Sequence, residues 1–360
     1  MPRLDAETIR KRLNSKGYVR KDVRIIEQGG YVLLPLTDRV DRSVIDEEGL
    51  EIVEGDPRER ECYRTPFDII KERLALPDRL ADLLPYKWEM LGDVLIAKFP
   101  VELRPAIKRI AETYAAELKA KTVLDERGYI DGVFRTPRME IVYGTETETI
   151  HHEGTILYKL DATKLMFSSG NFDEKKRMGE LDCTGETVVD MFAGIGYFTL
   201  PLAKMAHAKR VIACEINPLA YSYLQQNIKL NGVEEVVETY LGDNRTLPYE
   251  NVADRIVMGY IGSTEASLPK AMRLIKKGGI IHYHDVCSID EIPEKMVDAI
   301  AEAAGEKQFE VLQVKEVKAY APCKSHMVID VRMHACGPRS TKLSTDPRSY
   351  IETHDKDKTS

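Results

Sequence analysis

Three short polar segments carry residue types that could hold a ligand containing a nucleoside. The first is DMFAGIGYF, residues 190–198, in which Asp190, Gly194 and Gly196 stand after an apolar run. Glycines let the backbone pass close to a ligand because no Cβ is in the way. Glu215 follows Gly196 by nineteen residues, and a carboxylate at that spacing can accept hydrogen bonds from both ribose hydroxyls. The pattern predicts a nucleoside site.

The rest of the loop decides between a dinucleotide and S-adenosylmethionine. The dinucleotide fingerprint has a third glycine, and Thr199 occupies that position here. Asp190 suits a methionine amino group or its bound water, while Asp243 and Asn244 supply an acceptor and a donor for adenine. Each carboxylate alone is equally well explained as a helix cap or a surface charge. Their joint placement at three successive strand ends argues against that explanation and favours S-adenosylmethionine.

Alternating strand and helix patterns must bring these segments together. From about residue 161 onward, apolar runs alternate with helical stretches of ten or more residues, which predicts a parallel sheet with covered faces. The runs 311–321 and 325–334 lack an intervening helix and should form an antiparallel hairpin at one edge. The stretch 267–279 is predicted as one helix. Because ligands bind at the carboxyl ends of strands in such sheets, the polar segments should meet there.

The domain organisation follows shifts in composition along the chain. Residues 1–45 are predicted to form a small α/β domain, and residues 46–66 an acidic linker. Residues 67–160 are interpreted as an α+β domain that binds RNA or substrate, with a long amphipathic helix. Residues 161–337 are predicted to bind S-adenosylmethionine and to be catalytic. The polar residues 338–360 are expected to be disordered.

Composition limits the class of protein. Of the 360 residues, 43% are apolar and 31% charged, an ordinary globular balance. No apolar run is long enough to span a membrane, and we expect no signal peptide. Six scattered cysteines without a C-x-x-C pair argue against zinc and fit a reducing compartment. We therefore expect a cytoplasmic protein with no metal and no membrane partner.

The charge distribution leaves room for an RNA partner. The net charge of −7 disfavours nucleic acid on average. Basic residues nevertheless gather in 104–121, 135–138 and 159–177, and phosphate binding depends on local potential. A solvated charged face explains any single run better than a binding site does.

The motifs resemble those of enzymes that modify the guanosine 3′ of the tRNA anticodon. The similarity covers about residues 85–335, and its most specific segments are DMFAGIGYFTLPLA, CEINPLAYSYLQQNIKLNGV and GDNR. Two related branches share them: the tRNA guanine-37 N1-methyltransferases and the archaeal-type wybutosine-synthesis aminocarboxypropyltransferases. The resemblance implies a Rossmann-like class I methyltransferase fold, an α/β architecture with a seven-stranded, mostly parallel sheet. Residues 1–45 are also similar to the small N-terminal domain of the methyltransferases.

Two segments separate the branches. After the fourth strand the methyltransferases carry Asn-Leu-Pro, and this chain has Met258-Gly259-Tyr260-Ile261-Gly262. Before the core it has MFSSGN, residues 166–171, which is similar to the aminocarboxypropyl branch. The resemblance thus implies transfer of the 3-amino-3-carboxypropyl group to C7 of 4-demethylwyosine in tRNA(Phe). The methyltransferase reaction at guanosine N1 and a non-catalytic tRNA-binding protein stay open as alternatives.

The same resemblance implies the site residues. It places cofactor contacts on Ser168, Lys175, Glu215, Asp243 and Asn244, with both Lys175 and Ser168 at the methionine tail. Further candidates are Arg135 and Tyr260 for substrate contact, Arg138 and Glu140 as counterparts of the target-base machinery, and His284 as a proton acceptor. A histidine at a strand end is more often structural. We expect a monomer that binds the anticodon arm, with aromatics Tyr197, Phe167 and Tyr260 near the pocket.

Overall fold

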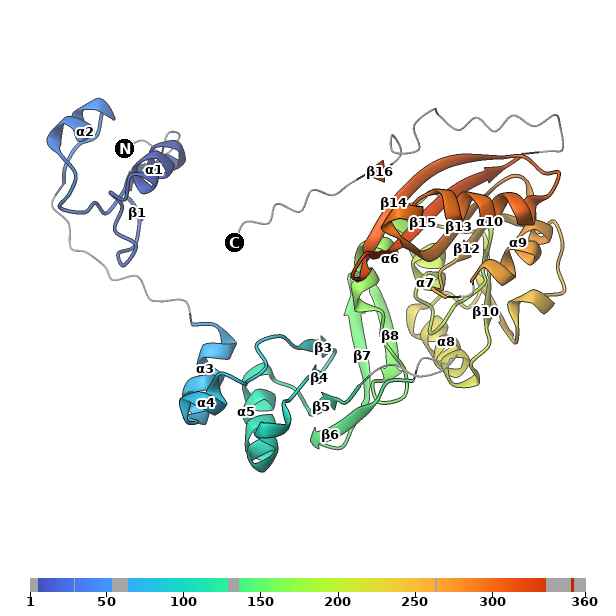
Figure 1. Ribbon diagram of the computed structural model, residues 1–360, viewed down its shortest axis with the longest axis horizontal. Helices are drawn as coiled ribbons and strands as arrows, with labels where there is room; N and C mark the ends of the chain where they lie inside the picture. Colours follow the sequence, from blue (N-terminus) through green and yellow to red (C-terminus); the bar gives the residue numbers. More distant parts are fainter. Residues whose placement is uncertain are drawn as a thin grey trace. The chain divides into compact units, whose positions relative to one another are not determined.

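The computed structural model describes residues 6–28, 30–53, 64–128, 136–262, 264–334 and 351–352 (Figure 1). Arg135, one predicted substrate contact, lies outside them. The chain forms two compact units, residues 1–72 and 73–360. Over the described ranges, no helix combines the length and the apolar character that a membrane crossing requires.

The first unit is a small α/β structure. Helix α1 (Ala6–Ser15) buries one stripe, Ala6, Ile9 and Leu13, and ends before Gly17, whose φ is +73°. Its two strands pair antiparallel, with Gln28 opposite Tyr31. The unit's remaining elements are β1 (Ile26–Gln28), β2 (Tyr31–Leu33), α2 (Arg42–Glu47) and the start of α3 (Pro66–Leu74). Helix α2 thus extends into the stretch expected to be a linker.

A four-stranded sheet opens the second unit. Its order is β3 (Glu89–Leu91), β4 (Val94–Ala97), β5 (Thr122–Glu126) and β6 (Met139–Tyr143). Strands β4 and β5 pair in parallel and are joined through the 3-10 helix η1 (Val101–Ala106) and helix α5 (Ile107–Leu118). The short helix α4 (Asp78–Ala81) precedes β3 in the chain. Ile110 and Tyr114, in the middle of the apolar stripe of α5, are fully buried, and Ile107 and Leu118 at its ends are partly buried, in line with the helical periodicity.

A two-stranded hairpin, β7 (Glu148–Glu153) and β8 (Ile156–Asp161), is tied to helix α8 (Pro218–Asn231) by side-chain amides. Asn227 accepts from the Lys159 amide at 2.7 Å and donates to its carbonyl at 3.1 Å. Asn231 bonds Leu157 in the same way. Two asparagines four residues apart lie on the same face of a helix. Their side-chain amides therefore bond the backbone N–H and C=O groups of β8 at Leu157 and Lys159, as a neighbouring strand would.

The large sheet is mostly parallel, as predicted. Strands β9 to β13 pair in parallel, and β15 lies antiparallel between β13 and β14. Across the sheet the strands are β11 (Val237–Leu241), β10 (Arg210–Glu215), β9 (Thr187–Asp190), β12 (Ala253–Met258), β13 (Ile275–Ser288), β15 (Lys324–Met333), β14 (Phe309–Ala321) and β16 (Ile351–Glu352). Seven of these were expected. The eighth, β16, pairs with β14 from within the stretch expected to be disordered.

Helices cover both faces of this sheet, as Figure 1 shows. Successive residues of β9 point to opposite layers, because side chains alternate along a strand. Val188 packs in one core with side chains of α6 (Phe172–Gly179), α7 (Thr199–Lys204) and α8. Val189 packs in the other with side chains of α9 (Leu268–Leu274) and α10 (Glu294–Ala304).

The helix predicted over 267–279 is shorter than expected. Helix α9 ends at Leu274, and β13 begins at Ile275, opposite Ala253 of β12. The register then shifts before Ile280 pairs with Arg255. Gly278, with φ +83°, lies in the shifted stretch, where a left-handed backbone favours glycine. Helical spacing alone did not reveal that strand pairing begins this early.

Candidate functional site

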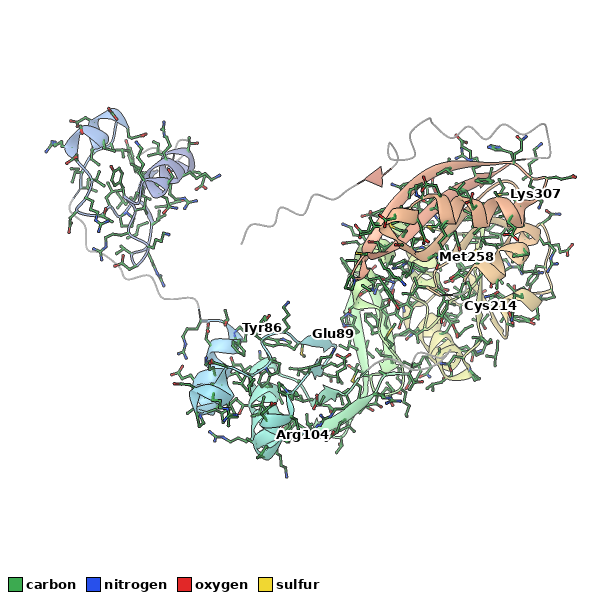
Figure 2. All side chains as sticks on the ribbon, viewed as in Figure 1. Tyr86, Glu89, Arg104, Cys214, Met258 and Lys307 are labelled. Carbon is green, nitrogen blue, oxygen red and sulfur yellow. The ribbon has the colours of Figure 1, made fainter. Side chains whose placement is uncertain are left out.

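A cavity of about 730 Å³ lies where β9, β10, β11 and β12 end. Figure 2 labels Cys214 and Met258, which stand near the ends of β10 and β12. The walls come from separate parts of the chain. They comprise 165–171, 214–217, 242–245, 259–262 and 318–320, with Met191, Phe192, Gly194, Ile195, Tyr197, Ala220, Ala266, Ser267 and His326. Gly196, a predicted cofactor contact, is not among these lining residues. All three predicted polar segments contribute to one wall, as the topology rule requires.

The glycine loop after β9 is shaped by close contacts. Gly194 and Gly196 have φ values of +57° and +106°, which other residues adopt only with strain. A Cβ at Gly196 would stand 2.9 Å from Leu200 Cγ. Asn227, the residue that holds β8, also donates to the Ile195 carbonyl at 3.0 Å. Helix α8 therefore fixes both the hairpin and the loop.

Glu215 ends β10 and is held by two backbone amides. Oε2 accepts from the Gly194 amide and Oε1 from the Asn217 amide, each at 2.7 Å. Burial raises the pKa of Glu215, and these hydrogen bonds oppose the rise. A carboxylate has about four acceptor positions, so each oxygen retains capacity for a ligand hydroxyl at the cavity wall.

Asp190 lies behind the glycine loop. It is fully buried and is not among the residues that line the cavity. Its carboxylate accepts from the Thr199 hydroxyl at 2.7 Å and from the Phe192 amide at 3.2 Å. Burial raises the pKa of Asp190 to about 6. Thr199, which stands where a dinucleotide-binding loop has its third glycine, thus donates a hydrogen bond to Asp190 at the start of the loop.

Asp243 and Asn244 follow β11 and line the cavity. Arg245 pairs with the Asp243 carboxylate and lowers the pKa of Asp243. The Asn244 side chain donates to the Met191 carbonyl at 3.0 Å. Its Oδ1 is buried and has no hydrogen-bond partner among the described residues. A buried acceptor without a donor costs free energy, so this oxygen is suited to a ligand N–H.

Ser168 lines the cavity, whereas Lys175 lies outside its wall. Lys175 is buried, and its Nζ lies 2.6 Å from Glu153 Oε1 and 4.4 Å from the centroid of the Phe167 ring. Burial lowers the pKa of Lys175 and raises that of Glu153. Phe167 and Tyr197 do line the cavity. That Lys175 holds a methionine carboxylate stays a prediction.

Tyr260 also lines the cavity and stacks on Phe192, with ring centroids 5.4 Å apart and planes 15° apart. The neighbouring Gly259 faces Phe198: a Cβ there would come within 2.2 Å of its ring. The segment that distinguishes the two branches therefore leaves room for Phe198. All three aromatics expected near the pocket, Tyr197, Phe167 and Tyr260, line it.

Glu140 belongs to the four-stranded sheet, Arg138 directly precedes its strand β6, and neither lines the cavity. Arg138 is exposed. Glu140, on β6, accepts from Arg104 at 2.7 Å and from Arg127 at 2.9 Å. Figure 2 labels Arg104, which also bonds the buried Asp125 at 3.0 Å. Arg104, from the first of the predicted basic runs, is thus paired with carboxylates.

His284 is fully buried and does not line the cavity. Burial lowers the pKa of His284 to about 3, with the charge of Arg177 acting in the same direction. Its Nδ1 lies 3.1 Å from Nε2 of His326, a histidine that does line the cavity. The structure therefore puts a different histidine at the wall from the one the sequence singled out.

The wall also contains polar residues that the sequence did not single out, among them Asn171, Lys318 and His326. Asn171 belongs to the segment MFSSGN and has a buried Oδ1 with no partner in the described residues. Lys318 and His326 lie on β14 and β15. Both lie within residues 85–335, the stretch over which the sequence resembles the family, which was the available signal.

The wall fits S-adenosylmethionine. Glu215 offers acceptors for ribose, Asn244 offers an unpartnered acceptor for an amino group, and the glycine loop leaves room for the backbone to approach. No group of His, Cys, Asp and Glu in the part of the chain that the structure describes could hold a metal ion.

Three family models match the chain: the TRM5/TYW2 methyltransferase domain over residues 149–312, the TYW2 N-terminal domain over 68–147 and the tRNA methyltransferase 5 N-terminal domain over 1–44. A tRNA(Phe) (4-demethylwyosine(37)-C(7)) aminocarboxypropyltransferase of Pyrococcus horikoshii is 44% identical over 72% of this chain and 93% of its own length. The enzyme of the same name from Methanocaldococcus jannaschii is 42% identical over 68% of this chain and 97% of its own length.

Solved structures agree with these matches. The P. horikoshii TYW2 in complex with MeSAdo has 41% identity and a TM-score of 0.68, covering 74% of this chain and 99% of its own. The Trm5b of Pyrococcus abyssi has 32% identity and a TM-score of 0.70, and the match covers 93% of this chain and 98% of the Trm5b chain. The chain therefore belongs to the TRM5/TYW2 family of tRNA-modifying enzymes, in its wybutosine-synthesis aminocarboxypropyltransferase branch, and uses S-adenosylmethionine as co-substrate.

Proposed function

We propose that this protein transfers the 3-amino-3-carboxypropyl group of S-adenosylmethionine to C7 of 4-demethylwyosine at position 37 of tRNA(Phe), releasing 5′-methylthioadenosine. The 44% identity to a curated enzyme of that activity carries the proposal. Gly259 supports it: Phe198 fills the space beside this glycine, at the segment where the methyltransferases are expected to carry Asn-Leu-Pro.

Two ends of the cavity take different parts of the co-substrate in this proposal. The adenosine end consists of Glu215, Asp243 and Asn244 with the glycine loop. The transfer end consists of residues 165–171, 259–262, Lys318 and His326. The sulfonium makes the bonded carbons electrophilic, and the protein decides which of them meets the base by holding the reacting atoms about 3–3.5 Å apart and in line.

The substrate contacts in the proposal are shared between regions. Tyr260, in the transfer end, contacts the target base, and Arg135 and Arg138 contact the anticodon arm. Glu140 keeps Arg104 and Arg127 in place by charge-assisted hydrogen bonds of 2.7–2.9 Å. We further propose that the protein acts as a monomer in the cytoplasm.

A second candidate, methylation of guanosine N1, is favoured by one observation. The P. abyssi tRNA (guanine(37)-N(1))-methyltransferase Trm5b is 34% identical over 92% of this chain, which includes the region of the N-terminal domain match. The relatives named as aminocarboxypropyltransferases align with 68–72% of the chain.

The test uses S-adenosylmethionine labelled either at the carboxyl or at the methyl carbon. Each is incubated with tRNA(Phe) carrying 4-demethylwyosine and with tRNA(Phe) carrying guanosine at position 37. We expect carboxyl label to enter only the first tRNA, with an equal amount of 5′-methylthioadenosine. Methyl label in the second tRNA would establish the methyltransferase instead. Cofactor binding without any label transfer would establish a non-catalytic tRNA-binding protein.

A further inference from the structure

The residues that line the two ends of the cavity differ in charge. The adenosine end includes the carboxylates of Glu215 and Asp243. The transfer end, as far as the structure describes its lining, contains no Asp or Glu and one lysine, Lys318. Arg245, the other Lys or Arg of the described lining, pairs with Asp243. The transfer end is therefore the part of the cavity suited to an anionic group.

The irregular course of β14 brings Lys318 to this wall. Strand β14 has two extra residues relative to β15, Val317 and Tyr320, one at each of the register shifts on either side of Lys318. Such bulges bend a strand and re-aim its side chains, and they are common beside active sites. Three consecutive residues, 318–320, line the cavity here, whereas the side chains of a regular strand alternate between its faces.

Gly170 leaves room for the Lys318 side chain. A Cβ at Gly170 would stand 3.0 Å from Nζ and 3.3 Å from Cδ of Lys318, so any larger residue at this position would crowd the ammonium group. Gly170 lies in the 3-10 helix η2 (Ser169–Asn171) and in MFSSGN, the segment similar to the aminocarboxypropyl branch. The space for this lysine thus comes from a segment that distinguishes the two branches.

The lysine that the family resemblance places at the methionine tail is less accessible. Lys175 is buried behind the wall, and its Nζ lies 2.6 Å from Glu153 Oε1. Burial lowers the pKa of Lys175, and the charge of Lys318 acts in the same direction, so the two ammonium groups repel one another. Burial also raises the pKa of Glu89, a further carboxyl that interacts with Lys175 (Figure 2). An anion at the wall would reduce the repulsion between the two lysines.

The methionine tail of the co-substrate supplies such an anion, because it ends in a carboxylate. Burying a carboxylate is costly unless it is paired or hydrogen-bonded, and a lysine ammonium offers three donors. Adenosine occupies the other end of the cavity in the proposed function, so the tail extends from the sulfur toward the transfer end.

We infer that Lys318 binds the carboxylate of the methionine tail at the transfer end, beside Gly170. The inference rests on the proposed function, in which the tail is the transferred group. Holding the carboxylate on β14 fixes one end of the tail and restricts the freedom of its reactive carbon, which is how a positioned group promotes transfer. Lys175 then supports the wall through its pair with Glu153.

The test compares two ligands that differ in this carboxylate, S-adenosylmethionine and its decarboxylated form. Calorimetry without tRNA measures both affinities. Wild-type protein should bind S-adenosylmethionine about 10- to 100-fold more tightly, as expected for a charge-assisted hydrogen bond. In Lys318→Met this preference should fall to about threefold or less, while the affinity for 5′-methylthioadenosine keeps its wild-type value. Lys318→Arg retains a cation and should retain most of the preference.

Lys324→Met is the matched control, because Lys324 lies on β15 of the same hairpin, is exposed and does not line the cavity. It should show the wild-type preference. A wild-type preference in Lys318→Met would overturn the inference, and so would an equal loss of affinity for 5′-methylthioadenosine, which has no carboxylate. If thermal unfolding shows that Lys318→Met does not fold, Lys318→Gln decides by the same comparison.

An RNA contact and a failure of the proposed function give different results. Weaker tRNA binding by Lys318→Met with an unchanged preference between the two ligands would assign Lys318 to the RNA and overturn the inference. Wild-type protein that releases no 5′-methylthioadenosine with tRNA carrying 4-demethylwyosine would refute the proposed function. The comparison of ligands uses no tRNA and is independent of that result.

Discussion

The two ends of the cavity are built in different ways. At the adenosine end, each residue stands at the end of a parallel strand or within a few positions after it, and Glu215 is held by backbone amides of its own and the neighbouring loop. At the transfer end, the wall combines segments more than 150 residues apart, from Ser168 to His326. Buried charges support it: Lys175 with Glu153, and Arg177 with Glu174 and Asp330.

This difference assigns different tasks to the two ends. Backbone amides and short loops follow from the sheet topology, so the adenosine end can remain the same across enzymes that transfer different groups. Buried ion pairs fix the orientation of side chains but contribute little net stability, because desolvation offsets their attraction. The transfer end is therefore the region where a substitution can change which carbon reacts.

The largest expected effect concerns the ion pair behind the transfer end. Lys175→Met leaves the Glu153 carboxylate buried without its partner, and breaking such a pair costs about 3–5 kcal/mol of unfolding free energy. Urea denaturation should show this loss, and Lys175→Met combined with Glu153→Gln should recover most of it. The variant should also bind S-adenosylmethionine less tightly, with a smaller loss for 5′-methylthioadenosine, which lacks the methionine tail.

The matched control for this prediction is on the same helix. Lys176 lies 3.6 Å from Glu180, and both side chains are about 60% exposed. Lys176→Met should cost less than about 1 kcal/mol, as exposed pairs do. Equal losses in the two lysine variants would show that the buried pair does not support the transfer end.

The next effect concerns Asp190, which lies behind the glycine loop of the adenosine end, and it is tested through the pH dependence of the unfolding free energy. The pKa of Asp190 is raised to about 6 by burial, against about 3.9 in an unfolded chain. The stabilisation from the protonated form is therefore complete below about pH 4 and is lost as pH rises through about 6. Two pKa units correspond to about 3 kcal/mol. Asp190→Asn keeps an acceptor for the Phe192 amide and removes this dependence.

Denaturant unfolding between pH 4 and pH 8 measures the Asp190 effect. The wild-type protein should lose stability relative to Asp190→Asn between about pH 4 and pH 6, and the two curves should run parallel once pH is well above about 6. Parallel curves throughout would mean that Asp190 ionises as readily in the fold as in the unfolded chain.

A smaller effect is expected for ribose binding. Glu215→Ala removes charge-assisted hydrogen bonds worth about 1.5–3 kcal/mol, and calorimetry should record a correspondingly weaker affinity. Because ribose is common to both ligands, the losses for S-adenosylmethionine and 5′-methylthioadenosine should be equal. This is the opposite of the pattern expected for Lys175. An unequal loss would move Glu215 out of the adenosine end.

The adenosine end could be read from the sequence because it depends on local rules. Strand ends, a glycine loop and a carboxylate at fixed spacing place Gly194, Glu215 and Asn244 together once the sheet is known to be parallel. The family and the fold class were likewise predictable from the motifs and the alternating pattern, and both are confirmed.

The transfer end could not be read in this way. His284 and His326 occur in similar strand sequences, and only the β13–β15 register shows which ring reaches the cavity. Lys175 was matched to the family by its position in the sequence, but its ion pair with Glu153 could not be predicted, because it depends on how α6 lies against β7. The early start of β13 depends on pairing with β12. Each of these is set by tertiary contacts over long separations.

The smallest expected effect concerns the unpartnered oxygen of Asn244. Asn244→Ala removes a neutral acceptor, and such hydrogen bonds contribute about 0.5–1.5 kcal/mol. The affinity for 5′-methylthioadenosine should fall accordingly. If Oδ1 accepts from the adenine amino group, an analogue with unsubstituted purine should bind wild-type protein more weakly, and Asn244→Ala should bind both ligands alike. A variant that still prefers the amino-bearing ligand would assign that contact to Asp243, and adenine would then be recognised by the charged member of the pair.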